Sequence, residues 1–497
     1  MIKRKMFKTY KMNKVKIVSV FVVFLLINSC TRKFEELNTN RNAPTENNPA
    51  TLLPSVIFEP LNDHINLQMW LTDQIMQYYV RRNDNQLDNY DFATGSVFFN
   101  AIWRRNYSAI SNANDMIAGA QQRGLGAYEA AGKTLRAFYL ATNTELWIDA
   151  PASQAGLGIE NTVPAYDKQQ AIYTNVLKDL KDANTTFAAS SGFVQGGDVL
   201  FKGDVTKWRK FANSLRLRYL LRLSNKAEVN APTEINTIVS NPATYPIITE
   251  NNEAAVYDFT GVSPNISSLA VQAMPVFSGL SMSKRIQDVF ASYNDPRVDF
   301  FFIRPVNATR FPNHEGVPNG IPREQAQSWN GNGDAHTSVL TTRFVNNGLL
   351  DFSFISHAEV KFILAEAALK NWINTGTTAK QYYDAGITAN FNQWNINMPA
   401  GFLNLPAVAW NNTMARLMDQ KWMAFFFNNT VEAWGEYKRT GLPALTIGPL
   451  ASTVTNGKIP TRIFYPELEQ SINSANYKAA AAGIGGDIIT AKHWYQN

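Results

Sequence analysis

The residue with the most distinctive chemical setting in this sequence is Cys30, its only cysteine. The run Leu25-Leu26-Ile27-Asn28-Ser29 precedes it, so an apolar segment and a small residue lead directly to the thiol. With the basic leader before them, they form the order that a lipoprotein signal peptidase and its acyltransferase require. We therefore expect Cys30 to be acylated and to begin the mature chain. An ordinary secretory signal followed by a chance cysteine is the alternative.

The leader, residues 1–29, has the composition of a signal peptide. It holds seven lysines and arginines and no acidic residue, and only Ser19 interrupts the apolar segment from Ile17 to Ile27. Eleven helical residues span about 16 Å, roughly half of a bilayer core, which is too short for a transmembrane helix. Either Met1 or Met12 is compatible with this pattern. Residues 30–50, rich in Asn, Thr and Pro, are expected to form a lipidated tether.

The residue types that usually carry catalysis show no recognisable spacing. The sequence has five scattered histidines and no H-E-x-x-H, G-x-S-x-G or G-x-x-x-x-G-K motif. A glycosidase needs two carboxylates roughly 5 to 10 Å apart, but Glu359 and Glu366 are better explained by a helix cap and a buried ion pair. We therefore expect no enzyme activity, no catalytic residue, no cofactor and no metal site. Calcium binding by loop Asp and Asn residues stays open, since no EF-hand spacing is visible.

The composition predicts a large globular domain that meets neutral polar ligands. Without residues 1–29 the chain keeps 468 residues, with 39 basic and 40 acidic side chains. This balance lacks the basic surface that nucleic acid requires. Charged residues make up only 17% and aromatic residues 12% of the chain. A chain of this size buries enough apolar surface to fold without disulfides, so we expect residues 51–497 to form a single domain.

Three apolar stripes at helical spacing predict buried helix faces. They are Leu61, Ile65, Met69, Thr72, Met76 and Tyr79; Ile172, Val176, Leu180, Ala183 and Phe187; and Trp208, Phe211, Leu215 and Tyr219. Later, Ser356-His357-Ala358-Glu359 has the form of a capping box, and Tyr383, Ile387 and Trp394 mark an answering helix. Small residues on one helix that meet aromatic residues on the next are typical of tetratricopeptide repeats. Residues 126–147 and 166–187 form a second candidate pair.

The helical signal fades in two places, and both are candidates for a ligand surface. Prolines and glycines interrupt residues 251–354 repeatedly, and a shorter break runs through residues 81–95. Long loops in a compact protein are usually functional. A sugar presents apolar C–H faces and a rim of hydroxyls, which aromatic rings and amides match. Our hypothesis for the ligand-binding residues is Asn83, Tyr90, Phe311, Asn313, Trp329 and Asn332.

A series of motifs in a fixed order resembles the second large group of SusD/RagB-like nutrient-binding outer-membrane lipoproteins. The resemblance covers essentially the whole mature chain. Its motifs are Gly203-Asp204-Val205-Thr206-Lys207-Trp208, continuing to Arg218; Asn294-Asp295-Pro296-Arg297; Ala365-Glu366-Ala367; Gln420-Lys421-Trp422; Glu432-Ala433-Trp434; Lys438-Arg439-Thr440-Gly441 before Pro443; and Ile459-Pro460-Thr461-Arg462 with Tyr465-Pro466.

The resemblance implies a mostly α fold, in which four tetratricopeptide-like helix pairs pack against a loop-rich half with few short strands. It also implies a non-catalytic protein that sits over a SusC-like TonB-dependent transporter and hands it oligosaccharides or, in some members, peptides. The segment Lys33-Phe34-Glu35-Glu36 looks like the surface-export signal of Bacteroidetes lipoproteins, which would place the lipid-anchored protein on the outer face of the outer membrane. The alternative is a tetratricopeptide-like protein-interaction scaffold of the outer membrane without a small ligand of its own.

The charged and aromatic residues of these motifs are expected to be structural. Trp208, Trp422 and Trp434 sit at helical spacings and should fill the core. A carboxylate among alanines and leucines is costly without a partner. We therefore expect the following pairing: Arg216, Arg218, Arg222, Lys438 and Arg439 with Glu366, Glu432 and Glu436.

Overall fold

The computed structural model describes residues 48–84, 86–92, 97–271, 279–343 and 350–496. Residues Asn48–Asn497 form one compact unit. Cys30, the leader and nearly all of the tether lie outside the described residues, so the expectations about them stay predictions. Within the described ranges, no helix is both long and apolar enough to span a membrane.

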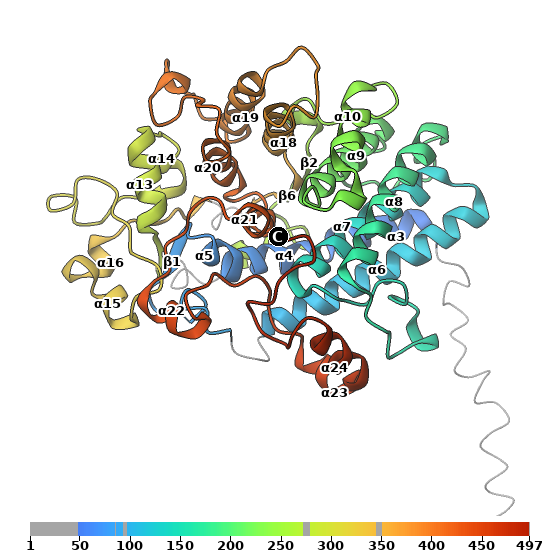
Figure 1. Cartoon of the computed structure of the whole chain (residues 1–497), viewed down its shortest axis with the longest axis horizontal. Coiled ribbons are helices and arrows are strands. Elements are labelled where there is room, and N and C mark those ends of the chain that lie inside the picture. The colour runs from blue at the N-terminus through green and yellow to red at the C-terminus, as the bar shows by residue number, and fades with distance from the viewer. Residues whose placement is uncertain (1–47, 85, 93–96, 272–278, 344–349, 497) are drawn as a thin grey trace, which may run out of the picture. The chain divides into compact units, whose positions relative to one another are not determined.

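Long helices that follow one another in the chain build the first part of this unit (Figure 1). The helix α6 packs against α7, α7 against α8, and α8 against α9. The predicted helix at residues 126–147 and its partner are confirmed as α7 and α8. The elements of this part are α3 (Pro49–Phe58), α4 (Leu61–Leu67), η1 (Gln68–Thr72), α5 (Asp73–Ile75), α6 (Val97–Arg123), α7 (Gly126–Trp147), α8 (Gln169–Ala189), α9 (Val205–Arg222) and α10 (Ala231–Ser240).

The later helices add two further pairs, α18 with α19 and α20 with α21. With α6–α7 and α8–α9 they give the tetratricopeptide-like pairs that the family resemblance implies. Local signals explain their starts, because Thr378 and Gln381 form a reciprocal capping box at α19 and Asn429 caps α21. The bounds are α18 (His357–Leu369), α19 (Ala379–Gln393), α20 (Met414–Phe425), α21 (Thr430–Thr440), α22 (Pro449–Thr455), α23 (Glu467–Ile472) and α24 (Ser474–Gly483).

The predicted capping box at α18 is only half correct. The hydroxyl of Ser356 accepts a hydrogen bond from the backbone N–H of Glu359 at 3.2 Å. The Glu359 carboxylate does not bond back to the helix start, since it accepts two bonds of 2.6 Å from Arg218. A buried guanidinium is a stronger partner for a carboxylate than a backbone amide.

Residues 251–354 form the loop-rich half, as predicted, and contain most of the short strands. The strands β1, β3, β5 and β4 form an antiparallel sheet in that order, and β2 pairs with β6. Their bounds are β1 (Tyr79–Arg81), β2 (Ala255–Tyr257), β3 (Leu280–Met282), β4 (Phe302–Ile303), β5 (Val339–Leu340) and β6 (Phe352–Ile355). This half also holds α11 (Ser268–Val271), α13 (Lys284–Tyr293), α14 (Val298–Phe301), α15 (Arg323–Gln327) and α16 (Gly333–His336). Helix α13, of ten residues, was not predicted.

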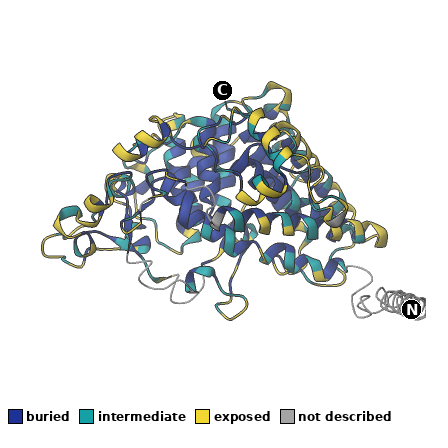
Figure 2. Ribbon diagram, turned by 90° about the horizontal axis from the view of Figure 1, so that it is seen from below, coloured by how far each residue is buried: buried dark blue, intermediate teal, exposed yellow. Residues whose placement is uncertain are grey.

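The three apolar stripes lie in the core, as the sequence predicts, but the first is not a single helix face. It runs through α4, η1 and α5, and its last member, Tyr79, belongs to strand β1. Trp208, Trp422 and Trp434 are buried with these stripes. Figure 2 shows buried residues running through the helical elements, while exposed residues lie along their outer faces and at the loops. Apolar burial is therefore the main source of stability for this unit.

Ten charged side chains are buried together at the centre of the helices, and we call them the buried charge network. Each is exposed by 6% or less. Five cations face five carboxylates, so the network is neutral. Its members are Arg218, Arg222, Lys421, Lys438 and Arg439 with Glu145, Glu359, Glu366, Glu432 and Glu436.

The predicted ion pairs are confirmed in part. Arg222 binds Glu432 at 2.7 Å, and Arg439 binds both Glu366 at 2.7 Å and Glu436 at 2.6 Å. The sequence did not reveal Glu145, Glu359 or Lys421 as members of the network. The predictions for Arg216 and Lys438 were wrong, because Arg216 pairs with Glu234 of α10 and Lys438 pairs with Glu145 of α7. The network joins α7, α9, α18, α20 and α21, so it fixes these helices relative to one another.

Candidate functional site

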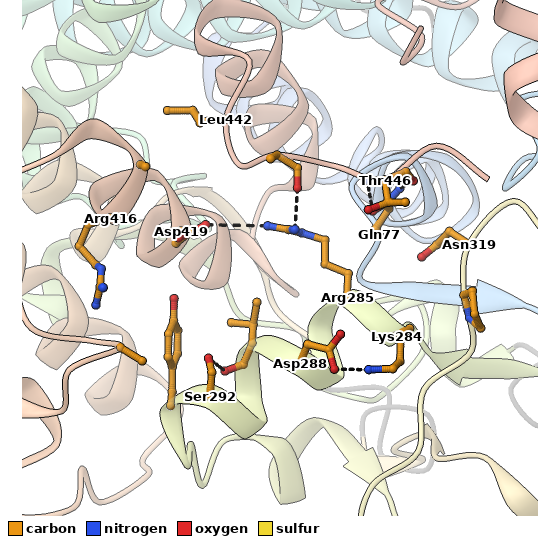
Figure 3. A pocket seen from close by; sticks show the side chains of 16 residues that line it. Gln77, Lys284, Arg285, Asp288, Ser292, Asn319, Arg416, Asp419, Leu442 and Thr446 are labelled. Atoms are coloured by element: carbon orange, nitrogen blue, oxygen red, sulfur yellow. Dashed lines mark hydrogen bonds and ion pairs between the residues drawn. The ribbon is translucent and has the colours of Figure 1, made fainter. Parts of the chain in front are cut away.

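A cavity of about 650 Å³ opens in the loop-rich half, and we call it the hollow (Figure 3). One wall is α13, a second is α20, and the loop after α21 covers one side. Its lining residues are Gln77, Lys284, Arg285, Asp288, Val289, Ser292, Tyr293, Pro318, Asn319, Ala407, Ala415, Arg416, Asp419, Leu442, Ala444 and Thr446.

The two wall helices present polar faces because their apolar residues point the other way. In α13, Ile286 and Phe290 are buried, so Arg285, Asp288 and Ser292 share the opposite face at helical spacing. Each helix starts at a capped residue: Ser283 accepts from the Ile286 amide at 3.0 Å, and Thr413 accepts from the Arg416 amide at 3.2 Å. These caps fix where the charged residues of the hollow lie along each helix.

Arg285 reaches across the hollow toward α20 (Figure 3). Its Nη1 donates to the carbonyl oxygen of Ala444 at 2.6 Å, and its Nη2 lies 3.8 Å from Asp419 Oδ1. The guanidinium also stands 5.0 Å from the centre of the Trp422 ring, a favourable cation–π arrangement. Burial lowers the pKa of Arg285 and raises that of Asp419, against the opposing effect of Arg285 and Arg416. The charges of the hollow are therefore poorly hydrated and available to a ligand.

Asp88 fixes the segment that closes the hollow beside Gln77. Its carboxylate accepts bonds from Asn319 Nδ2 at 2.5 Å and from the Gly320 amide at 2.6 Å. Asp88 is only 1% exposed, and burial raises its pKa to about 7, against the lowering effect of these two donors. It therefore positions Asn319 without facing the ligand itself.

The raised pKa of Asp88 predicts a pH-dependent stability. An acid whose pKa is higher in the folded state stabilises the protein below its unfolded pKa of about 4 and loses this contribution as pH rises through 7. Relative to the D88N variant, the protein should lose about 3 kcal/mol of unfolding free energy across this interval. Denaturant titrations of both proteins at pH 4.5 and 7.5 measure the difference. The control is D91N, which makes the same substitution at an exposed neighbour. A pH-independent difference for D88N would contradict the prediction.

The structure brings several of the sequence-predicted ligand residues into one region beside the hollow, which we call the aromatic loop cluster: Asn83, Phe311, Asn313, Trp329 and Asn332. The Nε2 of Gln327 donates a hydrogen bond to Asn83 Oδ1 at 3.4 Å, and this bond ties Asn83 to α15. Phe311 packs against His336 with 4.8 Å between ring centres and a tilt of 45° between the ring planes. Asn313 and Asn332 are exposed, and Phe311 and Trp329 are half-buried. The cluster thus offers rings and amides to solvent.

Trp329 connects the cluster to the hollow through a shared segment. It packs against the small buried cluster of Val80, Val317, Ile321 and Ala326. Pro318 and Asn319, which lie between two members of this cluster in the chain, line the hollow. The segment from Val317 to Ile321 is therefore common to the two regions.

Tyr90 lies apart from the cluster, in the core. It is 2% exposed and has a φ of 60°, a left-handed conformation that turns the chain after β1. Its ring faces other buried groups, so stacking on a ligand would require opening of the core. The proposed site does not include Tyr90.

None of the six predicted residues lines the hollow. The polar faces of α13 and α20 were a possible signal, but every helix at a protein surface has one. The nearby motif Asn294-Asp295-Pro296-Arg297 has a structural role instead. Asn294 ends α13 in a left-handed conformation, and Arg297 binds Asp295 at 2.5 Å and Asn390 of α19 at 2.6 Å.

A comparison with protein families gives a match over residues 41–466, to the family SusD-like_2, described as "Starch-binding associating with outer membrane". The chain belongs to this family. In this SusD-like protein the matched residues cover most of the described unit, including α13 and α20, the two helices that wall the hollow.

Solved structures support the same fold for this SusD-like protein. A chitin-binding protein matches with a TM-score of 0.77 and 25% identity, over 90% of this chain and 100% of that chain. A SusD homolog from Bacteroides fragilis has a TM-score of 0.76 and 22% identity, over 91% and 100%. A chitin-binding SusD homolog from Flavobacterium johnsoniae has a TM-score of 0.74 and 23% identity, over 90% and 97%. A search of curated proteins finds no match.

The described residues contain no group of three or more His, Cys, Asp or Glu side chains placed to hold a metal ion. The charged groups of the SusD-like hollow are Arg285, Arg416 and Asp419 in its interior. The amide of Gln77 is bonded at both ends to the backbone of Thr446, and the amide nitrogen of Asn319 donates to Asp88, so these two residues hold the walls in place.

Proposed function

We propose that this SusD-like protein captures an oligosaccharide at the outer membrane and delivers it to a SusC-like TonB-dependent transporter. The observation that carries the proposal is the family match over residues 41–466. The names of two related structures, both chitin-binding proteins, support a carbohydrate ligand. A peptide ligand is the alternative that the binding experiment below also examines.

The geometry of the loop-rich half supports capture of a small ligand. A volume of about 650 Å³ lies within the usual range of small-molecule sites. The hollow would hold one end of the oligosaccharide, and the rings of Phe311 and Trp329 would stack on sugar units that extend beyond it. Asn83, Asn313 and Asn332 would bond the hydroxyl rim.

We propose binding without hydrolysis. The two carboxylates of the hollow each have a cationic neighbour: Asp288 pairs with Lys284, and Asp419 lies 3.8 Å from Arg285. Each carboxylate of the hollow is thus engaged by a cation of the protein, whereas a glycosidase needs two carboxyl groups that face the scissile bond. Purified protein should therefore bind oligosaccharides and leave them intact.

We also propose that the acylated Cys30 anchors the protein at the outer face of the outer membrane. The single cysteine after a basic and apolar leader supports this, and the family's association with the outer membrane agrees with it. In cells fed with a labelled fatty acid, the C30S variant should lack the label that the native protein carries.

The W329A variant tests the capture function. Loss of a stacking ring should weaken oligosaccharide binding about tenfold, since such a contact is worth about 1 kcal/mol or more. Calorimetry against chitin oligomers, starch oligomers and peptides measures the affinity, and thin-layer chromatography of the same mixtures detects hydrolysis. The control is W410A, because Trp410 is half-buried like Trp329 but packs against Tyr383 and lies outside the lining of the hollow and the cluster.

Three results would contradict the proposal. Cleaved sugars would identify an enzyme, and binding of peptides alone would replace the ligand class. Binding of the transporter with no small ligand at all would favour the interaction scaffold.

A further inference from the structure

The hollow carries an excess of positive charge. Its charged lining residues are Lys284, Arg285, Asp288, Arg416 and Asp419. Lys284 and Asp288 pair with each other at the mouth of the hollow, one helical turn apart. Two guanidiniums then face the single carboxylate of Asp419.

The two guanidiniums are not fully used by the protein. Asp419 approaches Arg285 only to 3.8 Å, longer than a charge-assisted hydrogen bond. Arg416 donates from Nη2 to the carbonyl oxygen of Pro406 at 3.2 Å, and no ion pair of Arg416 occurs among the described residues. Guanidinium groups bind carboxylates in a planar, two-bonded geometry. Arg285 and Arg416 can therefore each donate hydrogen bonds to an anionic group of a ligand.

The hollow offers little surface for sugar stacking. Among the described residues that line the hollow, one is aromatic, Tyr293, and it is only 5% exposed. Recognition in the hollow therefore depends on charge and hydrogen bonds, whereas ring stacking belongs to the aromatic loop cluster. A neutral sugar would leave the positive excess uncompensated in a partly dehydrated cavity.

We infer that the hollow binds a carboxylate-bearing sugar, so that the captured oligosaccharide contains uronic acid units. This inference rests on the proposed capture function and names the ligand class of the same site. The sugar carboxylate lies between Arg285 and Arg416, and Asp419, which competes for the same guanidiniums, weakens its binding.

Asp419 gives the inference its sharpest test. The D419N variant removes the competing negative charge and keeps the side-chain shape. It should bind a carboxylated oligosaccharide about threefold to tenfold more tightly, because like charges a few ångströms apart repel by about 1 kcal/mol at high effective dielectric. R416Q should weaken the same binding about tenfold or more, through loss of a charge-assisted hydrogen bond.

The matched control is D182N. Asp182 of α8 is 37% exposed and pairs with Lys178, while Asp419 is 36% exposed and pairs with Arg285. The two changes remove the same charge from equally exposed positions, but Asp182 does not line the hollow. D182N should leave affinity unchanged.

The probes are trigalacturonate and its fully methyl-esterified form, in which each carboxylate is an uncharged methyl ester on the same sugar chain, together with a chitin trimer and an acidic tripeptide. Calorimetry with each variant should show tight binding of trigalacturonate, weaker binding of the ester, and opposite effects of D419N and R416Q on the acid alone. Added salt should weaken binding of the acid and spare that of the ester.

Each other outcome overturns a defined statement. Equal affinity for the acid and the ester, or a weakening by D419N, overturns the anionic ligand class and leaves oligosaccharide capture intact. If the acidic tripeptide binds and none of the sugars does, the ligand is not a sugar and the inference is wrong. Absence of binding to trigalacturonate and its ester overturns this inference, and absence of binding to the chitin and starch oligomers as well overturns the proposed function.

Discussion

Replacing Arg222 with methionine is expected to lower the free energy of unfolding by about 3 to 5 kcal/mol. The Arg222 guanidinium binds Glu145 at 2.8 Å, Glu432 at 2.7 Å and Glu436 at 3.4 Å. Methionine fills much of the space but leaves these buried carboxylates with one cation fewer. Burial by itself raises the pKa of Glu436, and the cations Arg439, Lys421 and Arg222 hold it well below its usual range.

Guanidinium chloride titration of R222M measures this loss. Arg105 offers the matched control, because it pairs with Asp63 at 3.1 Å on the surface, with 54% of its side chain exposed. R105M should change stability by less than about 1 kcal/mol, as exposed ion pairs usually contribute little. Equal effects of the two substitutions would show that the buried charge network does not carry the stability assigned to it.

Gly435 to alanine is expected to destabilise the protein by about 2 to 3 kcal/mol. In an exposed helix this change would stabilise by about 1 kcal/mol, since alanine has the better helix propensity. Here a Cβ on Gly435 of α21 would stand 2.1 Å from Arg222 Nη1 and 2.4 Å from Cζ. The guanidinium must move, and its bonds to the glutamates are disturbed.

The double variant R222M/G435A separates this mechanism from a general loss of packing. With the guanidinium gone, the added methyl group should cost little, so the two effects should be clearly less than additive. The control is G126A at the first turn of α7, where the nearest atom to a new Cβ is Ser190 Cβ at 3.4 Å. Thermal unfolding of the four proteins provides the comparison, and full additivity in the double variant would refute the proposed contact.

The helical part of the fold is predictable from the sequence because its signals are local. The stripe from Ile172 to Phe187 marks one buried helix face, and its spacing depends on the helix itself and not on which elements pack against it. The buried charge network was predictable only in part. Arg222 evidently needs a carboxylate, but the chain does not reveal that Glu145, 77 positions earlier, supplies it.

The site was harder to predict, since it is assembled from distant segments. Gln77, Arg285, Asn319, Asp419 and Thr446 meet only in the folded chain. On α13 and α20 their charges resemble those of any solvent-facing helix. Aromatic residues in loops were the visible signal, and they led to Phe311 and Trp329, and also to Tyr90, whose positive φ turns its ring into the core.

Glu145 also constrains the timing of folding. Its carboxylate pairs with Arg222 at 2.8 Å and with Lys438 at 2.6 Å, and it accepts a hydrogen bond from Tyr495 Oη at 2.8 Å. Arg222 follows Glu145 by 77 positions, whereas Tyr495 follows it by 350. The complete set of partners therefore exists only when nearly the whole chain has been synthesised, so the centre of the helical part reaches its final arrangement late.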